Sequence, residues 1–253
     1  LLAEHVVDRA RLFILFSIGV VQGHITCQYA GIDLEQAQLT HERVSQRLKD
    51  LCKLRAIAAM PVAGAFRAID FTLSNMSNSN INKVAVITQY NSRSLHDHLS
   101  AAKWWDLDRK QGGLFIFTPF LSRDNNYWFR GIADSIYQNI SFLKRSHEPY
   151  VVIASGDAVY KMDYNDIINY HIEKGADITV VYGKKELTPE QTKTRTILKV
   201  DDNNEVYDVL VRPELSGTLD ASMNIFVMSK EFVLNIINGA ASRNLYSFEV
   251  DVL

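Results

Sequence analysis

The chain has 253 residues, of which 47% are hydrophobic, 22% charged and 10% aromatic, a composition that excludes a disordered protein and is typical of a globular one. Lys and Arg number 27 against 29 Asp and Glu, and the resulting net charge of −2 excludes the basic footprint that a nucleic-acid-binding protein needs. Two cysteines, Cys27 and Cys52, are too few for a disulfide framework or a four-thiolate zinc site, so a reducing cytoplasm is the expected location.

The N-terminal region contains an apolar run over Leu12–Val21, which at ten residues is too short to span a bilayer. A signal peptide is an alternative, but Glu4 and Asp8 precede the run, and a buried strand or helix is the favoured interpretation. Residues Asp33–Leu54 then place apolar side chains at helical spacing, with Asp33 as the N-cap. No membrane association is expected from these patterns.

The middle of the chain alternates strand and helix patterns. Three runs rich in β-branched residues predict strands buried on both faces: Lys83–Thr88, Tyr150–Ala154 and Asp177–Tyr182. Helical spacing predicts three helices, the last of them with Gly175 as its C-cap: Ser92–Ala102, Ala133–Arg145 and Tyr164–Lys174. This alternation predicts an α/β sheet with right-handed crossovers.

From Arg195 onward the pattern is rich in strands. Residues Asp201–Asn204 predict the turn of a hairpin, and Ser222–Met228 predict a further strand. Because no repeat, linker or charge block interrupts the sequence, we predict that the α/β region is one domain.

Two local patterns are candidates for chemistry. The strand that begins at Tyr150 ends in Gly156 and Asp157, and ligands of open α/β sheets bind at the carboxyl ends of the strands. A carboxylate there suits Mg²⁺ shared with substrate phosphates, while capping of the next turn is an equally good interpretation. The segment Trp128–Gly131 leads into Asp134 at a helix start, where N–H groups and an arginine suit a phosphate. Taken alone, that segment favours a helix start beside a solvated arginine.

Three further patterns are weaker. His96 and His98 stand two apart on a predicted helix and point to different faces, so they are interpreted as a solvated or subunit-facing surface rather than a metal pair. The aromatic residues from Trp104 to Phe117 are interpreted as core or interface packing rather than a base-stacking platform. Asp163 suits an N-cap better than the Asp-x-Asp metal motif of glycosyltransferases.

Several segments, in order and spacing, resemble the bacterial glucose-1-phosphate adenylyltransferase (ADP-glucose pyrophosphorylase) family. The first is Leu48–Leu99. WFRGIADSIYQN (Trp128–Asn139) is similar to the family's WYRGTADAVxQN, VVIASGDAVYKMDY to its VVILxGDHxYxMDY, and ASMNIFVM to its ASMGIYVF. The final segment, YSFEVDVL, resembles the family's HDFGKDLIP.

The resemblance implies an α/β nucleotidyltransferase (Rossmann-like) domain over residues 47–253, with a mixed, mostly parallel sheet flanked by helices. Residues 1–46 match no part of the family and are predicted to be a separate segment, and the family's C-terminal β-helix domain is expected to be absent. The implied reaction joins ATP and glucose 1-phosphate to give ADP-glucose and pyrophosphate, the entry to glycogen synthesis.

The resemblance also implies roles for single residues. The implied glucose 1-phosphate site consists of Phe129, Thr196, Arg212 and Ser222. The implied nucleotide site consists of Arg47, Arg130, Gly131 and Asp134. Asp157 is the implied ligand of Mg²⁺, in a metal site that is expected to be incomplete.

Departures from the family pattern indicate weakened catalysis. The family's Gly-rich loop, AGGxGxRLxxLT, holds the nucleotide phosphates through backbone N–H groups, and here Thr40–Gln46 replaces its glycines. The tyrosine of WYRG is Phe129, and the histidine after the metal-binding aspartate is Ala158. The family's Glu-Lys-Pro at the sugar site reads Val211–Pro213, in which arginine keeps the charge of lysine but not its shape. No residue is therefore assigned a catalytic role.

These losses predict a protein most similar to the family's non-catalytic, regulatory (GlgD-type) subunit, which pairs with a catalytic glucose-1-phosphate adenylyltransferase subunit in a hetero-oligomer. Two alternatives remain: a weakly active catalytic subunit, and a stand-alone sensor of nucleotide or sugar phosphate.

Overall fold

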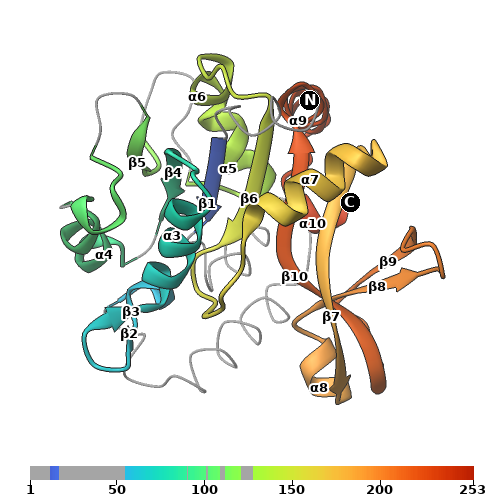
Figure 1. Ribbon diagram of the computed structural model, residues 1–253. Coiled ribbons are helices and arrows are strands. Elements are labelled where there is room, and N and C mark those ends of the chain that lie inside the picture. Colours follow the sequence, from blue (N-terminus) through green and yellow to red (C-terminus); the bar gives the residue numbers. More distant parts are fainter. Residues whose placement is uncertain (1–11, 17–54, 90, 101, 109–111, 121–127) are drawn as a thin grey trace, which may run out of the picture.

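The computed structural model describes residues 12–16, 55–89, 91–100, 102–108, 112–120 and 128–253 (Figure 1). Its centre is an eight-stranded mixed sheet in which four parallel strands lie in the order β5-β4-β1-β6: β5 (Gly113–Phe117), β4 (Lys83–Ile87), β1 (Leu12–Phe16) and β6 (Tyr150–Ser155). The long strand β10 (Gly217–Ser229) pairs antiparallel with β6. The predicted α/β class with a mixed sheet is confirmed.

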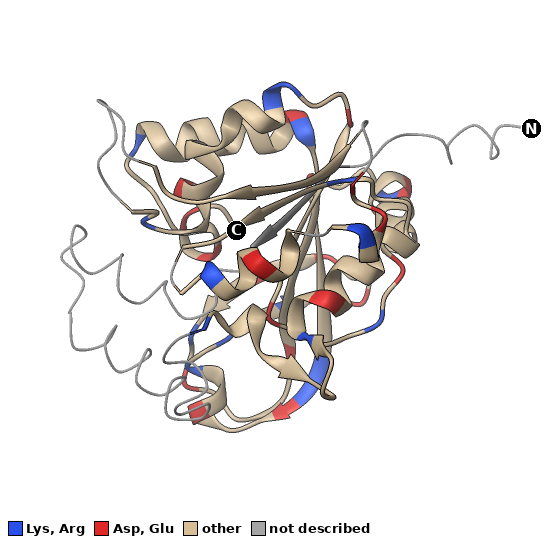
Figure 2. Cartoon of the chain, turned by 90° about the vertical axis from the view of Figure 1, so that its left-hand side faces the viewer, with Lys and Arg blue, Asp and Glu red and all other residues tan. Residues whose placement is uncertain are grey.

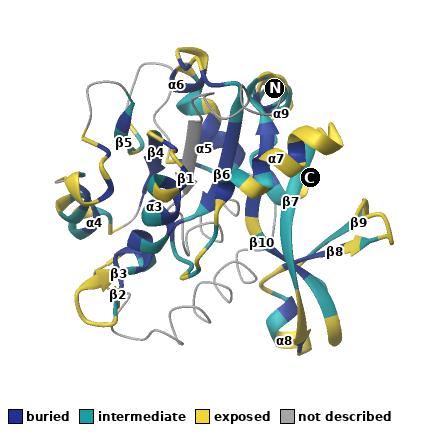
Figure 3. Ribbon diagram, in the orientation of Figure 1, coloured by how far each residue is buried: buried dark blue, intermediate teal, exposed yellow. Residues whose placement is uncertain are grey.

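Helices cover both faces of this sheet. One face carries α3 (Ala68–Asn78), α4 (Arg93–Leu99) and α7 (Tyr164–Lys174). The other face carries α5 (Ile132–Gln138), α6 (Ile140–Lys144), α9 (Lys230–Ser242) and α10 (Phe248–Asp251). Successive residues of β4 alternate between the two cores, Val84 facing the first and Ala85 the second. Burial on both faces is why β4 and β6 are continuous apolar runs (Figure 3).

A smaller antiparallel part extends from β10 (Figure 1). It contains β7 (Ile178–Leu187), α8 (Pro189–Thr192), β8 (Thr196–Val200) and β9 (Val206–Val211). The predicted hairpin is confirmed, because β8 and β9 pair antiparallel across residues 201–205. A strand does lie at Asp177–Tyr182, but the prediction that it is buried on both faces was wrong. This strand, β7, pairs with β10 on one side, and its residues are half-buried or exposed except for Leu187.

Other predicted boundaries change locally. The single helix predicted over Ala133–Arg145 is two helices that meet at Asn139, whose side chain donates to the Ser135 carbonyl at 2.8 Å. The described residues also include η2 (Ile57–Ala59), β2 (Pro61–Val62), β3 (Phe66–Arg67) and η3 (Lys103–Trp105).

The N-terminal segment contributes to the sheet. The apolar run at Leu12–Val21 supplies β1, which lies between β4 and β6, so residues before 47 take part in the fold. The helix predicted over Asp33–Leu54 lies outside the described residues. Among the residues that are described, no helix is long and apolar enough to cross a membrane.

His171 on α7 makes the stability of this fold depend on pH. Its ring is 3% exposed, and its Nδ1 lies 2.8 Å from the Thr179 hydroxyl. Burial lowers the pKa of His171, against a smaller opposing effect of Asp177, so the fold favours the neutral ring. As pH falls below the ordinary histidine value of 6.5, the unfolded chain takes up a proton that the folded chain does not, and stability decreases.

We therefore expect the free energy of unfolding, measured in urea, to fall more between pH 7.5 and pH 5.5 in the wild type than in His171→Gln. The extra fall corresponds to roughly a fraction of one proton, which the unfolded chain binds at His171 and the folded chain does not. The exposed His147→Gln is the matched control and should behave as the wild type. Parallel losses in all three proteins would contradict the assignment.

Candidate functional site

The carboxyl ends of the parallel strands meet at one edge of the sheet, and Asp157 lies there. The parallel register places Phe16, the last residue of β1, opposite Ser155, the last residue of β6. Thr88 and Gln89 follow β4 at the same edge. Asp157 is half-buried, and its Oδ1 accepts a hydrogen bond from the Ser155 hydroxyl. The predicted position of Asp157, at the carboxyl end of a central strand, is confirmed.

The loop that carries Asp157 is fixed to the neighbouring helices. Asn75 on α3 donates from Nδ2 to the Tyr160 carbonyl at 2.9 Å, and the hydroxyls of Tyr160 and Tyr164 lie 2.5 Å apart. Burial raises the pKa of both tyrosines, and the Asp157 carboxylate adds a small further increase at Tyr160. Both hydroxyls are therefore protonated at neutral pH, and the loop is held by uncharged hydrogen bonds.

The surroundings of Asp157 fit a metal ion that arrives with a nucleotide. Within the described part of the chain, no three His, Cys, Asp or Glu side chains are grouped so that they could hold a metal. Mg²⁺ is ordinarily bound by one or two carboxylates, with phosphate oxygens and water completing its octahedron. One half-buried carboxylate at a strand end suits that mode and not a complete protein cage.

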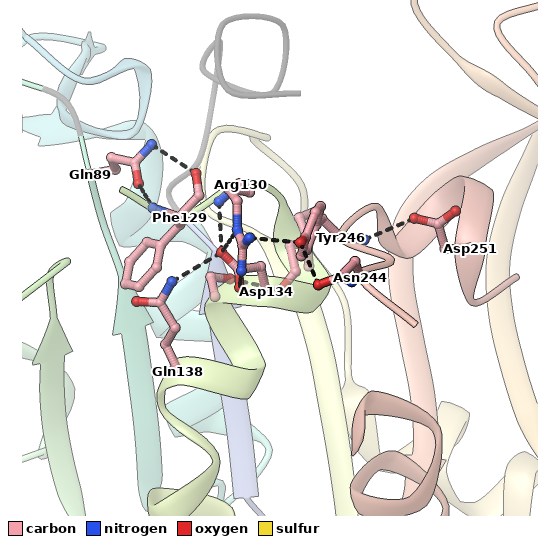
Figure 4. A network of polar contacts seen from close by, with 10 residues as sticks. Gln89, Phe129, Arg130, Asp134, Gln138, Asn244, Tyr246 and Asp251 are labelled. Atoms are coloured by element: carbon pink, nitrogen blue, oxygen red, sulfur yellow. Dashed lines mark hydrogen bonds and ion pairs between the residues drawn. The ribbon is translucent and has the colours of Figure 1, made fainter. Parts of the chain in front are cut away.

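Arg130 and Asp134, predicted for the nucleotide, form an ion pair with each other (Figure 4). Arg130 Nη2 donates to Asp134 Oδ1 at 3.2 Å, and the Arg130 backbone N–H donates to Asp134 Oδ2 at 2.8 Å. Arg130 Nη1 also donates to the Tyr246 hydroxyl at 2.6 Å, with the guanidinium carbon 3.8 Å from the centre of the Tyr246 ring. Gln138 donates to Asp134 Oδ2 at 3.0 Å. The pair thus joins α5 to the segment before α10.

Gly131 and Phe129, on either side of Arg130, have packing roles in this structure. A Cβ on Gly131 would lie 2.2 Å from the Tyr246 carbonyl oxygen, so the close approach of these two segments requires glycine. Phe129 is 1% exposed, and its backbone N–H and C=O both bond to the Gln89 side chain. The ring of Phe129 belongs to the core that α5 covers, and its contact with glucose 1-phosphate stays a prediction.

The other three residues predicted for glucose 1-phosphate come together on adjacent strands. Thr196 begins β8 and pairs with Val211 on β9, so Arg212 follows directly beside it. In the pairing of β10 with β8, Ala221 lies opposite Ile197, and Ser222 and Thr196 are the next residue of each strand. Thr196 is 3% and Ser222 6% exposed, whereas Arg212 is exposed and has a positive φ of 53°. Two buried hydroxyls and a guanidinium could bind a sugar phosphate.

Glu249 on α10 is a site residue that the sequence did not identify. Burial raises the pKa of the Glu249 carboxyl, and the Arg212 charge and the Thr196 hydroxyl oppose that increase more weakly. Thr196 Oγ1 has no partner at full hydrogen-bond geometry among the described residues. The available signal was the segment YSFEVDVL, where Glu249 stands at the glycine of HDFGKDLIP.

Two of the weaker patterns have clear outcomes. The histidines are half-buried rather than solvated: His96 Nε2 lies 3.1 Å from the Thr88 hydroxyl and His98 Nε2 lies 2.6 Å from Asp70 Oδ1, while the subunit-facing alternative stays a prediction. The N-cap at Asp163 is confirmed by its bond from the Asn165 N–H at 2.9 Å.

The aromatic stretch is partly buried and partly exposed: Trp105 is 5% exposed and Trp104 is 83% exposed.

Arg47 and residues 40–46 lie outside the described residues, so the predictions about the nucleotide loop stay predictions. In the view of Figure 2 acidic and basic residues are interspersed, without a continuous basic stripe on the described elements.

Comparison with known proteins gives a family and a fold. The profile of the nucleotidyl transferase family matches residues 44–251. The chain is 39% identical over 192 residues to a glucose-1-phosphate adenylyltransferase of Clostridium novyi, which covers 74% of this chain and 50% of the relative. It is 41% identical over 188 residues to that of Pseudothermotoga lettingae, covering 74% and 44%. The chain thus spans about half the length of the curated relatives that it matches.

A solved structure shares the fold at much lower identity. The crystal structure of HddC from Yersinia pseudotuberculosis superimposes with a TM-score of 0.63 over 96% of this chain and 85% of that chain, at 14% sequence identity. This likeness supports the α/β architecture and its sheet, while the site rests on the residues described above.

Proposed function

The chain belongs to the nucleotidyl transferase family, and from this premise we propose that it is part of a regulatory subunit of a glucose-1-phosphate adenylyltransferase. In this proposal it pairs with a catalytic subunit, which converts ATP and glucose 1-phosphate to ADP-glucose and pyrophosphate for glycogen synthesis in the cytoplasm. One observation carries the regulatory role: Val211, which lies opposite Thr196 in the register of β8 and β9, stands at the glutamate of the family's Glu-Lys-Pro, so an apolar side chain replaces a carboxylate at the candidate sugar-phosphate site.

The loss of this carboxylate matters because nucleotidyl transfer depends on positioning and charge. The sugar phosphate oxygen must attack the α-phosphorus in line, and cationic groups must stabilise the charge that develops there. Valine accepts no hydrogen bond from a sugar hydroxyl, so it cannot hold the sugar in place for this attack. Mg²⁺ bound with the nucleotide would supply charge neutralisation, and in this proposal Asp157 is its protein ligand.

The test is pyrophosphate release from ATP and glucose 1-phosphate with Mg²⁺, measured for the purified chain, for a catalytic glucose-1-phosphate adenylyltransferase subunit, and for the two together. We expect the chain alone to be at least about 10²-fold slower than the catalytic subunit, the effect of losing a single stabilising contact in such reactions. We expect the mixture to differ from the catalytic subunit in rate or in half-saturating substrate concentration.

Each alternative has its own outcome. Substantial turnover by the chain alone that is lost in Asp157→Ala would establish a weakly active catalytic subunit and overturn the regulatory role. Binding of ATP or glucose 1-phosphate by the chain, without any change in the kinetics of the catalytic subunit, would instead establish a stand-alone sensor.

A further inference from the structure

A stripe of buried polar side chains on α3 faces the segment that carries Asp157. Thr72, Asn75 and the C-cap residue Ser79 stand three and four residues apart, so they lie on one side of the helix. Thr72 and Ser79 are fully buried, and Asn75 is 6% exposed. Burial of polar groups destabilises a fold unless they form hydrogen bonds, so the partners of this stripe indicate what it is for.

The stripe holds the chain on the N-terminal side of Asp157. Thr72 Oγ1 donates to the carbonyl of Ser155, the last residue of β6, at 3.4 Å. The Ser155 hydroxyl donates in turn to Asp157 Oδ1. The contact with α3 thus reaches the Asp157 carboxylate through a single intervening residue.

The stripe also holds the chain on the other side of this carboxylate. Asn75 Nδ2 donates to the Tyr160 carbonyl at 2.9 Å. Ser79 Oγ accepts the backbone N–H of Tyr164, the first residue of α7, at 2.9 Å. Within the described part of the chain, residues 157–162 lie in no helix or strand, and their backbone makes no hydrogen bond to another backbone group. The position of this segment therefore depends on side chains, and the Asn75 amide reaches its middle.

We propose that Asn75 and Thr72 are positioning residues for Asp157: from α3 they hold its carboxylate at the carboxyl ends of the parallel strands, where Mg²⁺ arrives with a nucleotide. This inference rests on the proposed function, in which Asp157 is the protein ligand of that metal. A carboxylate that is already held in place binds a metal more tightly, because the entropy of ordering its segment is not lost on binding. Groups that orient the ligands of a metal typically contribute about 10–100-fold to its affinity.

The test uses Mn²⁺ as a spectroscopic probe for the metal site of the purified chain. Binding of Mn²⁺ in the presence of ATP is measured by electron paramagnetic resonance, and binding of ATP by calorimetry with Mn²⁺ and with EDTA. Asn75→Leu removes the amide and keeps the approximate size of the side chain. It should weaken Mn²⁺ binding about tenfold or more and leave the ATP affinity in EDTA unchanged. Asn78→Leu, the same substitution at an exposed position of α3, is the matched control and should change neither.

A second pair of variants keeps the proposal testable if Asn75→Leu does not fold. Thr72→Val removes the hydroxyl and should weaken Mn²⁺ binding about threefold or more, a smaller effect because the hydrogen bond of Thr72 is longer. Thr72→Ser keeps the hydroxyl and should bind Mn²⁺ as the wild type does. Unchanged Mn²⁺ affinity in folded Asn75→Leu or in Thr72→Val would overturn the proposal. A loss of ATP affinity that is equal with and without the metal would overturn it too, because it would show a purely structural role.

These outcomes are separate from those for the proposed function. If the wild type binds no Mn²⁺ in the presence of ATP, or binds it no better than Asp157→Ala, then Asp157 is not the metal ligand and this inference fails with that part of the proposed function. A loss in Asp157→Ala without a loss in Asn75→Leu would overturn this inference alone. The expected losses together with no effect on a catalytic subunit would overturn the regulatory role alone.

Discussion

Gly131→Ala is expected to destabilise the folded chain by about 1–3 kcal/mol, the usual cost of forcing extra volume into a packed site. The added Cβ would lie 2.2 Å from the Tyr246 carbonyl oxygen and 2.8 Å from its carbonyl carbon. Because both are backbone atoms, no side-chain rotation relieves the clash. Separation of the two segments would also lengthen the hydrogen bond from the Ala133 N–H to the Tyr246 carbonyl, now 3.1 Å. Urea unfolding followed by circular dichroism measures the change.

Gly239→Ala is the matched control. Gly239 lies inside α9, and a Cβ there would meet nothing within 4 Å. Alanine is more favourable than glycine in a helix interior by about 1 kcal/mol, so this variant should be as stable as the wild type or more stable. Equal stability of Gly131→Ala and the wild type would show that the approach of Tyr246 to the start of α5 is not a constraint on the fold.

The parallel part of the fold could be predicted because its signals are local. The residues of β4 and β6 are apolar except for Lys83 at the start of β4 and Ser155 at the end of β6, which is typical of strands buried on both faces, and both strands lie where the sequence predicts them. The helix α7 begins after Asp163 and ends at Gly175, whose φ of 61° is the left-handed conformation that favours glycine. In these cases a residue and its immediate neighbours determine the structure.

The sequence predicted less where the burial or the boundary of a segment depends on the elements that contact it. The residues of β7 have the same β-branched composition as those of β4, but β7 borders β10 alone and is half-buried. The split of one predicted helix at Asn139 depends on a side-chain bond to the Ser135 carbonyl. The strand β5 was not predicted; its aromatic residues were interpreted as core or interface packing, and Phe115 and Phe117 pack against Phe142.

The residues of the candidate site also differ in whether local sequence could place them. Asp157 follows a strand and could be placed from the sequence, because the rule for strand ends is local. Glu249 could not, because the groups that influence its pKa, Thr196 and Arg212, are distant in sequence and come near it only through the packing of α10 against the sheet. The ion pair of Arg130 with Asp134 joins residues four apart on the chain, so it could be expected from the sequence. The hydrogen bond from Arg130 to Tyr246 is tertiary and could not.

Asp134→Ala is expected to lower the free energy of unfolding by about 3 kcal/mol, near the lower end of the range for removing one partner of a buried ion pair. The Asp134 side chain is 2% exposed and the Arg130 side chain 26%, so the arginine left behind recovers only part of its hydration. The variant also removes the acceptor of the Gln138 amide and an acidic residue in the first turn of α5. Urea unfolding at pH 7 measures the loss.

Two comparisons show whether the loss comes from the pair itself. Asp166→Ala removes an exposed first-turn acid from α7 and should cost less than about 1 kcal/mol. Arg130→Met combined with Asp134→Ala leaves no unpaired charge, so the double variant should be less destabilised than the sum of the two single variants, with a coupling between 0.5 and about 3 kcal/mol. Strictly additive losses would show that Arg130 and Asp134 act independently. Arg130 would then be free of the influence of Asp134 when it binds a phosphate.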